Sequence, residues 1–241
     1  HRVELIEKGD QLGGLVNLAQ LPLYKCRLGQ FKEYLIREVN KRPIKVKLNT
    51  TFDQNYVQDN PPDMIVLATG SIPIIPDIRG LDQIEVYAIE DILMYSSSIR
   101  NKKFIVIGGG RNGCEVAEVL ATKGNEVTII EMKETLAEDM EKKNRRDLLN
   151  RLKAHQIYWL VNHQVVGVEN GKVIALDLKS QVEVTLEADG VVPAAGYTPE
   201  NTLYETITEW GPEVRIIGDA LRVRGIEAAI FEGEMLAYSI D

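Results

Sequence analysis

The residues with the clearest chemical meaning are three glycines spaced G-x-G-x-x-G, the two residues inside that spacing and one later acidic residue: Gly108, Gly110, Arg111, Asn112, Gly113 and Glu131. The first glycine permits a tight turn, the second lets the backbone approach a pyrophosphate, and the third allows close helix–strand packing. The pyrophosphate would lie at the positive end of the helix, and the acidic residue, about 20 positions on, would accept hydrogen bonds from ribose hydroxyls. The pattern predicts a dinucleotide site; the alternative is a glycine turn in an α/β unit that binds no nucleotide.

Glu131 also predicts which nicotinamide cofactor is bound. Its carboxylate should repel a 2′-phosphate, which favours NADH, whereas nearby Lys133 keeps NADPH open. Glu7 ends a strand pattern in the same way and predicts the ribose site of a second adenosine. The glycine loop that should precede Glu7 is not in this sequence. Glu7 is therefore either an ordinary surface residue or part of a site whose first strand and loop are missing.

The elements around the glycine loop follow the order that such a site needs. Segment 104–107 is wholly apolar, which predicts a strand covered on both faces. A helix follows, with an apolar stripe made by Val116, Val119 and Leu120, and segment 127–131 predicts the next strand. Strand, glycine loop, helix and strand together are typical of a nucleotide-binding unit.

Other segments complete the pattern of an α/β protein. Segment 31–39 predicts a helix with Phe31, Leu35 and Val39 on one face. The charged segment 134–151 predicts a solvated helix, to which we assign no function. Segment 164–186 predicts a three-stranded antiparallel meander. Further buried strands that end at a glycine are predicted at 63–70, 189–196 and 214–218.

Length and composition limit the classes of function. The 241 residues carry 28 Lys and Arg against 36 Asp and Glu, a net charge of −8, which argues against a nucleic-acid or anionic-membrane partner. No apolar run approaches the roughly 18 residues of a membrane span, and no signal-peptide pattern is present. The three histidines lie outside the motifs and no metal-ligand spacing is found, so we expect no metal site.

The two cysteines form no disulfide framework, so a reducing cytoplasm is the expected location. Cys114 falls in the first turn of a predicted helix, where the helix dipole would lower the pKa of a thiol. The interpretation we favour is a small packing residue against the sheet. Cys26 has no motif around it.

In chain order, several segments resemble the two-dinucleotide-binding flavoproteins, the pyridine nucleotide–disulfide oxidoreductase architecture. They are the Glu7 strand with Gly14, Ala68-Thr69-Gly70, the glycine loop through Glu131, Gly196, and Gly218-Asp219. The resemblance implies an α/β fold of two Rossmann-like three-layer domains, with an NAD(P)-binding domain inserted into an incomplete FAD-binding domain. We expect residues 1–80 and 191–241 to form the FAD half and residues 81–190 the insert. It further implies that Glu7 and Asp219 bind FAD and that Ala68, Thr69 and Gly70 line the hinge.

A narrower resemblance rests on Gly13 to Ala19 with Pro22 and Lys25. This region is similar to the C-terminal part of 2-enoate reductase, 2,4-dienoyl-CoA reductase and trimethylamine dehydrogenase. Those enzymes join this module to an N-terminal barrel that holds FMN and a 4Fe-4S cluster. The residues of that barrel, including the cysteines that bind the cluster, are not in this sequence. The resemblance therefore implies a chain that begins after the first FAD glycine loop, with the barrel as its partner and a homo-oligomer allowed.

The resemblance implies hydride transfer from a nicotinamide to FAD and onward to the absent barrel. Because the cofactors carry out that chemistry, we nominate no catalytic side chain. A disulfide mechanism is disfavoured, since no cysteine lies between Gly14 and Pro22. Two alternatives stay open: a non-catalytic adenine-nucleotide module of a larger flavoenzyme, and a Rossmann-like methyltransferase. Gly70 and the Gly218-Asp219 turn favour the flavoprotein.

Overall fold

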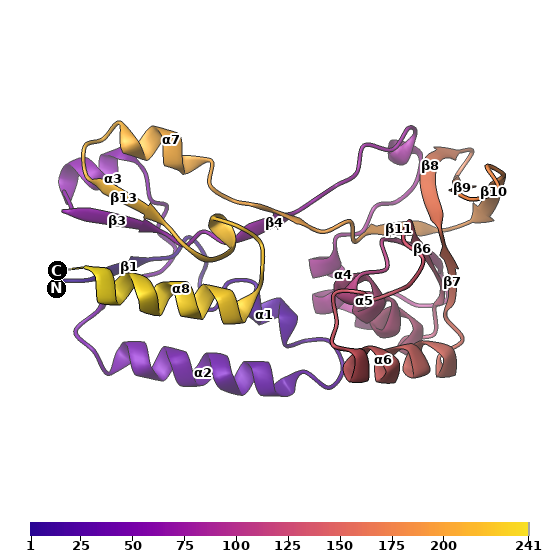
Figure 1. Cartoon of the computed structure of the whole chain (residues 1–241), viewed down its shortest axis with the longest axis horizontal. Helices are drawn as coiled ribbons and strands as arrows, with labels where there is room; N and C mark the ends of the chain where they lie inside the picture. Colours follow the sequence, from indigo (N-terminus) through magenta and orange to yellow (C-terminus); the bar gives the residue numbers. More distant parts are fainter. Residues whose placement is uncertain (241) are drawn as a thin grey trace. The chain divides into compact units, whose positions relative to one another are not determined.

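The structure is a computed structural model that describes residues 1–240. Its internal contacts divide the chain into two compact units (Figure 1). The terminal unit comprises His1–Gln20, Arg27–Ile72 and the chain from Tyr197 onward. The central unit comprises Leu21–Cys26 and Pro73–Gly196.

A four-stranded parallel sheet forms the middle of the central unit. Its order is β11 (Gly190–Pro193), β5 (Lys103–Ile107), β6 (Glu126–Glu131) and β7 (Tyr158–Val161). Neighbouring strands run parallel throughout. Side chains alternate between the two faces, so Phe104 and Val106 enter one core while Ile105 and Ile107 enter another. Both faces of this sheet must therefore be covered.

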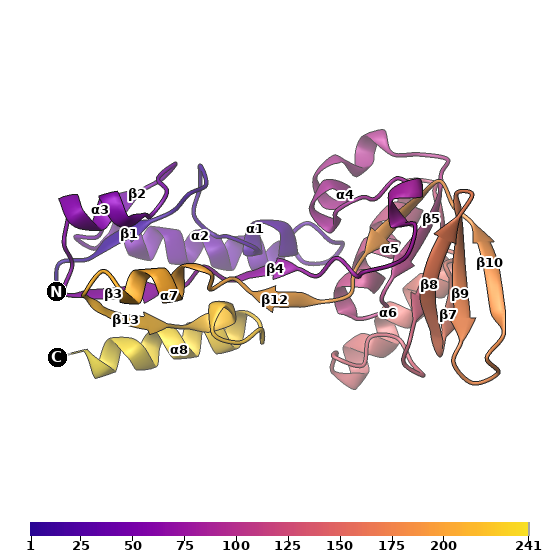
Figure 2. The same cartoon turned by 90° about the horizontal axis from the view of Figure 1, so that it is seen from above.

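Helices cover one face of this sheet and a second sheet covers the other. The helices are α4 (Ile89–Tyr95), α5 (Arg111–Thr122) and α6 (Lys142–Ala154). The second sheet is an antiparallel meander of β8 (His163–Glu169), β9 (Lys172–Asp177) and β10 (Glu183–Glu187). Figure 2 shows the helices on one side of β5 and the meander on the other. The meander lies where the alternating pattern of the sequence predicts it.

The central unit extends beyond the range 81–190 at both ends. Residues before 81 belong to it because Ile78 packs with Leu81 and Ile84 against the core shared with the meander. The carbonyl of Arg79 also accepts the amide of Val168 at 2.8 Å. Residues after 190 belong to it because β11 pairs with β5. Two 3-10 turns, η1 (Leu81–Gln83) and η2 (Ser96–Ser98), lie on either side of α4.

The terminal unit contains two separate pairs of parallel strands. β1 (Glu4–Ile6) pairs with β2 (Lys45–Lys47), and β3 (Met64–Leu67) pairs with β13 (Glu213–Ile216). The helical elements are α1 (Val16–Ala19), α2 (Cys26–Asn40), α3 (Gln54–Asp59), α7 (Leu203–Thr208), η3 (Gly218–Ala220) and α8 (Ile226–Ser239). β4 (Ser71–Pro73) pairs with β12 (Tyr197–Pro199) where the chain leaves the unit and returns.

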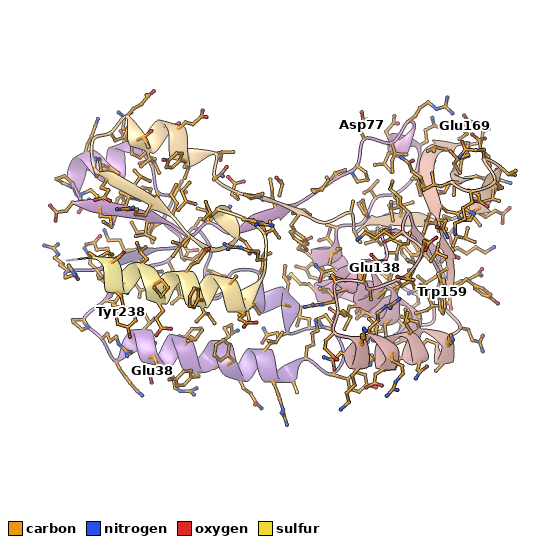
Figure 3. All side chains as sticks on the ribbon, viewed as in Figure 1. Glu38, Asp77, Glu138, Trp159, Glu169 and Tyr238 are labelled. Carbon is orange, nitrogen blue, oxygen red and sulfur yellow. The ribbon has the colours of Figure 1, made fainter. Side chains whose placement is uncertain are left out.

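The two longest helices of the terminal unit, α2 and α8, bury no residue. The pattern of Phe31, Leu35 and Val39 predicts a packed face, yet no residue of α2 is buried. In α8 no residue is buried either, and Tyr238 is 78% exposed. Figure 3 labels Tyr238 on α8 and Glu38 on α2. Part of each helix is half-buried, but large apolar side chains such as Phe31 and Phe231 are exposed, so within residues 1–240 no layer fully covers these helices.

Across the described part of the chain, no helix combines the length and the apolar character that crossing a bilayer requires.

Candidate dinucleotide-binding sites

The glycine loop lies between β5 and α5, as the sequence predicts. Gly108 has φ +109°, and a Cβ added there would lie 2.5 Å from the carbonyl oxygen of Ala194. A Cβ on Gly113 would collide with the carbonyl oxygen of Gly108. The amide of Gly108 donates to the carbonyl of Ile130 at 2.9 Å, which ties the loop to the end of β6. Gly108 and Gly113 are therefore required by the packing of the loop itself.

Gly110 differs from the other two glycines of the motif. It caps α5 in an extended conformation, with φ −65° and ψ −178°. The nearest atom to a Cβ added there is Oδ1 of Asp139, at 3.9 Å. The protein's own packing thus leaves this position open, which is the space that a pyrophosphate approaching the backbone would use.

The carboxylate of Glu131 is held against the glycine loop. Its Oε2 accepts the amide of Gly109 at 2.5 Å, and its Oε1 accepts the amide of Lys133 at 2.8 Å. The ammonium of Lys133 lies 3.3 Å from Glu138, which Figure 3 labels in the segment between β6 and α6. The charge of Lys133 therefore has a carboxylate partner on the same segment. Glu131 stands at the loop edge with a fixed orientation.

Sequence reasoning missed three residues of this site. A Cβ on Gly109 would overlap the side chain of Leu136 and lie 3.0 Å from the Cβ of Glu131, so the middle glycine of 108–110 is also needed. Leu136 covers the loop and is 2% exposed. Asp139 accepts the amide of Arg111 on its Oδ1 at 2.9 Å. The run of three consecutive glycines could have indicated Gly109. Nothing in the sequence distinguished Asp139 from the other charged residues of its segment.

The two remaining loop residues lie on the outer side of α5. Arg111 is exposed and donates from Nη2 to the carbonyl of Asp139 at 3.0 Å. Asn112 follows it in the first turn and is also exposed. Their backbone amides are at the positive end of a helix of 12 residues.

Cys114 is a packing residue. Its side chain is fully buried and its Sγ donates to the carbonyl of Gly109 at 3.3 Å. Burial, with the charges of Asp139 and other nearby carboxylates, raises the pKa of the thiol to about 12. The effect of desolvation exceeds that of the helix dipole here, so the thiol is not activated.

In the terminal unit, two of the predicted segments meet at one sheet edge. β3 and β13 are in parallel register up to Leu67 and Ile216, and the amide of Ile217 donates to the carbonyl of Leu67 at 3.0 Å. Ala68-Thr69-Gly70 and Gly218-Asp219 therefore follow the carboxyl ends of neighbouring strands, where open α/β sheets bind ligands. The Thr69 hydroxyl donates to the carbonyl of Glu200, whose amide donates to Gly70 at 2.9 Å.

The Gly218-Asp219 turn is held by charged and backbone contacts. Oδ1 of Asp219 accepts the amides of Arg224 at 2.8 Å and Gly225 at 2.9 Å. The amide of Gly218 donates to Glu232 at 2.7 Å, and Glu232 also pairs with Arg224. The Arg224 guanidinium, helped by that amide, lowers the pKa of Glu232. Sequence reasoning assigned no role to Arg224, which lies in the turn before α8, or to Glu232, which lies on α8.

The other predicted residues lie elsewhere. Glu7 follows β1, and its Oε1 accepts the amide of Gly9 at 2.7 Å. Gly14 has φ +47° and open space around a Cβ. Both belong to the terminal unit, but Glu7 is on the β1–β2 pair rather than on β3–β13. Gly196 ends the central unit with φ +105°, and its carbonyl accepts the amide of Ile74 at 2.9 Å.

Comparison with known proteins now decides the family. Residues 30–220 match the family model described as pyridine nucleotide-disulphide oxidoreductase. The chain belongs to this family. It is 33% identical to an NADH oxidase of Thermoanaerobacter brockii over 100% of this chain and 37% of the relative. It is 31% identical to a cinnamate reductase of Clostridium sporogenes over 100% of this chain and 36% of that protein.

A solved protein with a similar fold is a 2-naphthoyl-CoA reductase in complex with 2-naphthoyl-CoA. The TM-score is 0.90 at 29% identity, covering 100% of this chain and 36% of the reductase. The resemblance drawn from the motifs and the α/β fold class are thereby confirmed. The chain spans little more than a third of the length of these three relatives.

Proposed function

We propose that the central unit binds a nicotinamide dinucleotide, with NADH preferred, in a flavin-dependent oxidoreductase. One arrangement carries the proposal: a glycine loop at the N-terminus of α5 with the Glu131 carboxylate 2.5 Å from the amide of Gly109. In this arrangement the ribose hydroxyls would donate to Glu131, and the amides after Gly110 would receive the pyrophosphate. Open space at Gly110 fits that approach.

The residues of the loop would bind and orient, and the cofactors would react. NADH supplies a hydride and FAD accepts it. Glu131 would exclude a 2′-phosphate by charge, and the pairing of Lys133 with Glu138 weakens the case for NADPH. We nominate no side chain as acid or base, since hydride transfer requires none.

We further propose that the terminal unit is the FAD-binding domain. Gly218 and Asp219 follow β13 next to residues 68–70, at one sheet edge. There Asp219 would face the ribitol or pyrophosphate of FAD. Glu7 would face the ribose of the FAD adenosine. Among residues 1–240, β1 pairs only with β2, and β3 only with β13. The free edges of β1 and β3 would accept one further parallel strand, with its glycine loop, from a longer parent chain.

The parent protein is proposed to be of enoate-reductase type. The chain matches a cinnamate reductase and a 2-naphthoyl-CoA reductase over 100% of its own length but about a third of theirs. Electrons would pass onward to a barrel with FMN and a 4Fe-4S cluster, in a reducing cytoplasm. The alternative is a non-catalytic adenine-nucleotide module of a larger flavoenzyme. A flavin spectrum of the parent protein that bleaches with NADH would exclude this alternative.

Calorimetric titration with NADH and then NADPH tests the central unit. We expect NADH to bind more tightly than NADPH, and Glu131→Ala to weaken NADH binding by about 1.5–3 kcal/mol, the value of hydrogen bonds to a charged group. The same variant should lose discrimination against NADPH. Glu134→Ala, on the same segment and paired with Lys179, is the matched control and should bind as the parent chain does. Unchanged NADH binding in Glu131→Ala would refute the assignment.

A further inference from the structure

One anionic side chain already occupies the N-terminus of α5. The amide of Arg111, the first residue of the helix, donates to Oδ1 of Asp139 at 2.9 Å. A second carboxylate, that of Glu131, accepts the amide of Gly109. The donors that the glycine loop offers to a pyrophosphate are thus partly engaged by the protein's own carboxylates. Glu131 is the acidic residue that the dinucleotide fingerprint assigns to the ribose hydroxyls, whereas the fingerprint includes no residue at the position of Asp139.

The segment that carries Asp139 is anchored without its side chain. Leu136 is buried, the amide of Ala137 donates to the carbonyl of Gly109 at 2.7 Å, and Nε of Arg145 donates to the carbonyl of Leu136 at 2.7 Å. The side chain of Asp139 is 56% exposed. It can rotate into solvent while the segment stays in place.

We propose that Asp139 determines cofactor affinity as an internal anion that the dinucleotide phosphate must displace. The proposal rests on the proposed function of the glycine loop. Asp139 and a phosphate oxygen seek the same amide, and both are stabilised by the same helix end. Like charges cannot share that position at low cost, so binding exchanges one anion for the other.

Arg111 keeps its place during this exchange. Its Nη2 donates to the backbone carbonyl of Asp139 at 3.0 Å, whereas its Nε is 3.9 Å from the Asp139 carboxylate. The guanidinium is therefore held by the main chain rather than by the carboxylate. Once the side chain of Asp139 has left, one positive charge remains beside the helix end for the phosphate.

Asp139→Asn tests the proposal because it removes the charge and retains the Oδ1 acceptor. We measure the affinity of the 241-residue chain for NADH, ADP-ribose and adenosine. A single charge at a helix end corresponds to about a two- to fivefold change in affinity. NADH and ADP-ribose should bind more tightly by that factor, and adenosine, which has no phosphate, should be unaffected. Glu134→Gln makes the same change in net charge and should alter none of the three.

The outcomes separate this proposal from the function on which it rests. If the parent chain binds NADH and Asp139→Asn binds it equally or more weakly, Asp139 is a helix cap only and the proposal is wrong. Tighter binding of adenosine as well would also overturn it, because the effect would not act through phosphate. If neither form binds NADH, the proposed function fails too.

Discussion

At the scale of single residues, the glycines of the motif are required for two different reasons. Gly108 and Gly113 are needed because the protein's own backbone occupies the space of a Cβ. Gly110 has no such neighbour, so the fold does not require a glycine there, and we propose that the approaching pyrophosphate does. Spacing alone cannot separate these roles, since the same residue type satisfies both.

Substituting these glycines by alanine should separate stability from binding. Gly113→Ala places a Cβ against backbone and should destabilise the chain by about 1–3 kcal/mol, the cost of overpacking. Gly110→Ala should change the free energy of unfolding little but weaken NADH binding, because the Cβ enters the approach path of the pyrophosphate. Denaturant unfolding and NADH titration of both variants measure this. Equal losses of stability would contradict the distinction.

The thiols should differ sharply in reactivity. Because the pKa of Cys114 is raised to about 12, its thiol stays protonated through neutral and mildly alkaline pH. Cys26 is exposed. We expect a thiol reagent at mildly alkaline pH to label the folded chain at Cys26 alone and to label both cysteines in denaturant. Cys26→Ser should abolish the fast reaction; rapid labelling of that variant would show that Cys114 is accessible.

At the scale of elements, α5 and α6 are joined by a buried charge. Glu118 on α5 is 2% exposed, and Arg151 on α6 contacts both its oxygens, at 2.7 and 3.2 Å. Leu148 and Leu152 of α6 are buried beside this pair. The charged segment 134–151, predicted as a solvated helix, therefore contributes a packed face and a partly exposed arginine that pairs with a buried carboxylate. Because charged residues dominate this stretch of the sequence, the buried face made by the two leucines was not predicted.

Removing one partner of that pair should be costly. Arg151→Ala leaves the Glu118 carboxylate buried without its guanidinium, and we expect a loss of about 2 kcal/mol or more of unfolding free energy. Arg146→Ala, at an exposed position of the same helix, is the control and should cost far less. Chemical denaturation compares the two. A similar small effect in both would mean that water reaches Glu118.

At the scale of the whole molecule, the two units differ in how completely they are built. The central unit has a four-stranded sheet covered on both faces. The terminal unit has two strand pairs, and its helices α2 and α8 bury no residue. This difference agrees with a chain that spans little more than a third of its relatives. It is the physical basis for proposing a further strand between β1 and β3.

FAD binding should depend on that further strand. We expect the 241-residue chain to bind NADH but to retain FAD more weakly than a longer form that includes the preceding residues of its parent chain. The added strand would join the free edges of β1 and β3 and supply the second glycine loop. Flavin absorbance after desalting measures retention. Equal retention by both forms would show that Asp219 and its neighbours suffice.

The local sequence pattern alone predicts several elements of this protein. The apolar run 104–107, the glycine spacing and Glu131 specify a strand, a loop and an acceptor, because each depends on neighbours close in sequence. Alternation over 164–186 likewise predicted the meander.

Tertiary structure decided what depends on residues far apart in sequence. Asp139 meets the amide of Arg111 only because the segment after β6 folds back over the loop, held by Leu136. Burial raises the pKa of the Cys114 thiol, and that burial, which the favoured packing interpretation required, is set by the fold rather than by the helix alone. Whether an apolar helix face such as that of α2 is covered depends on which layer packs against it. Periodicity records an apolar face, but only the fold supplies its partner.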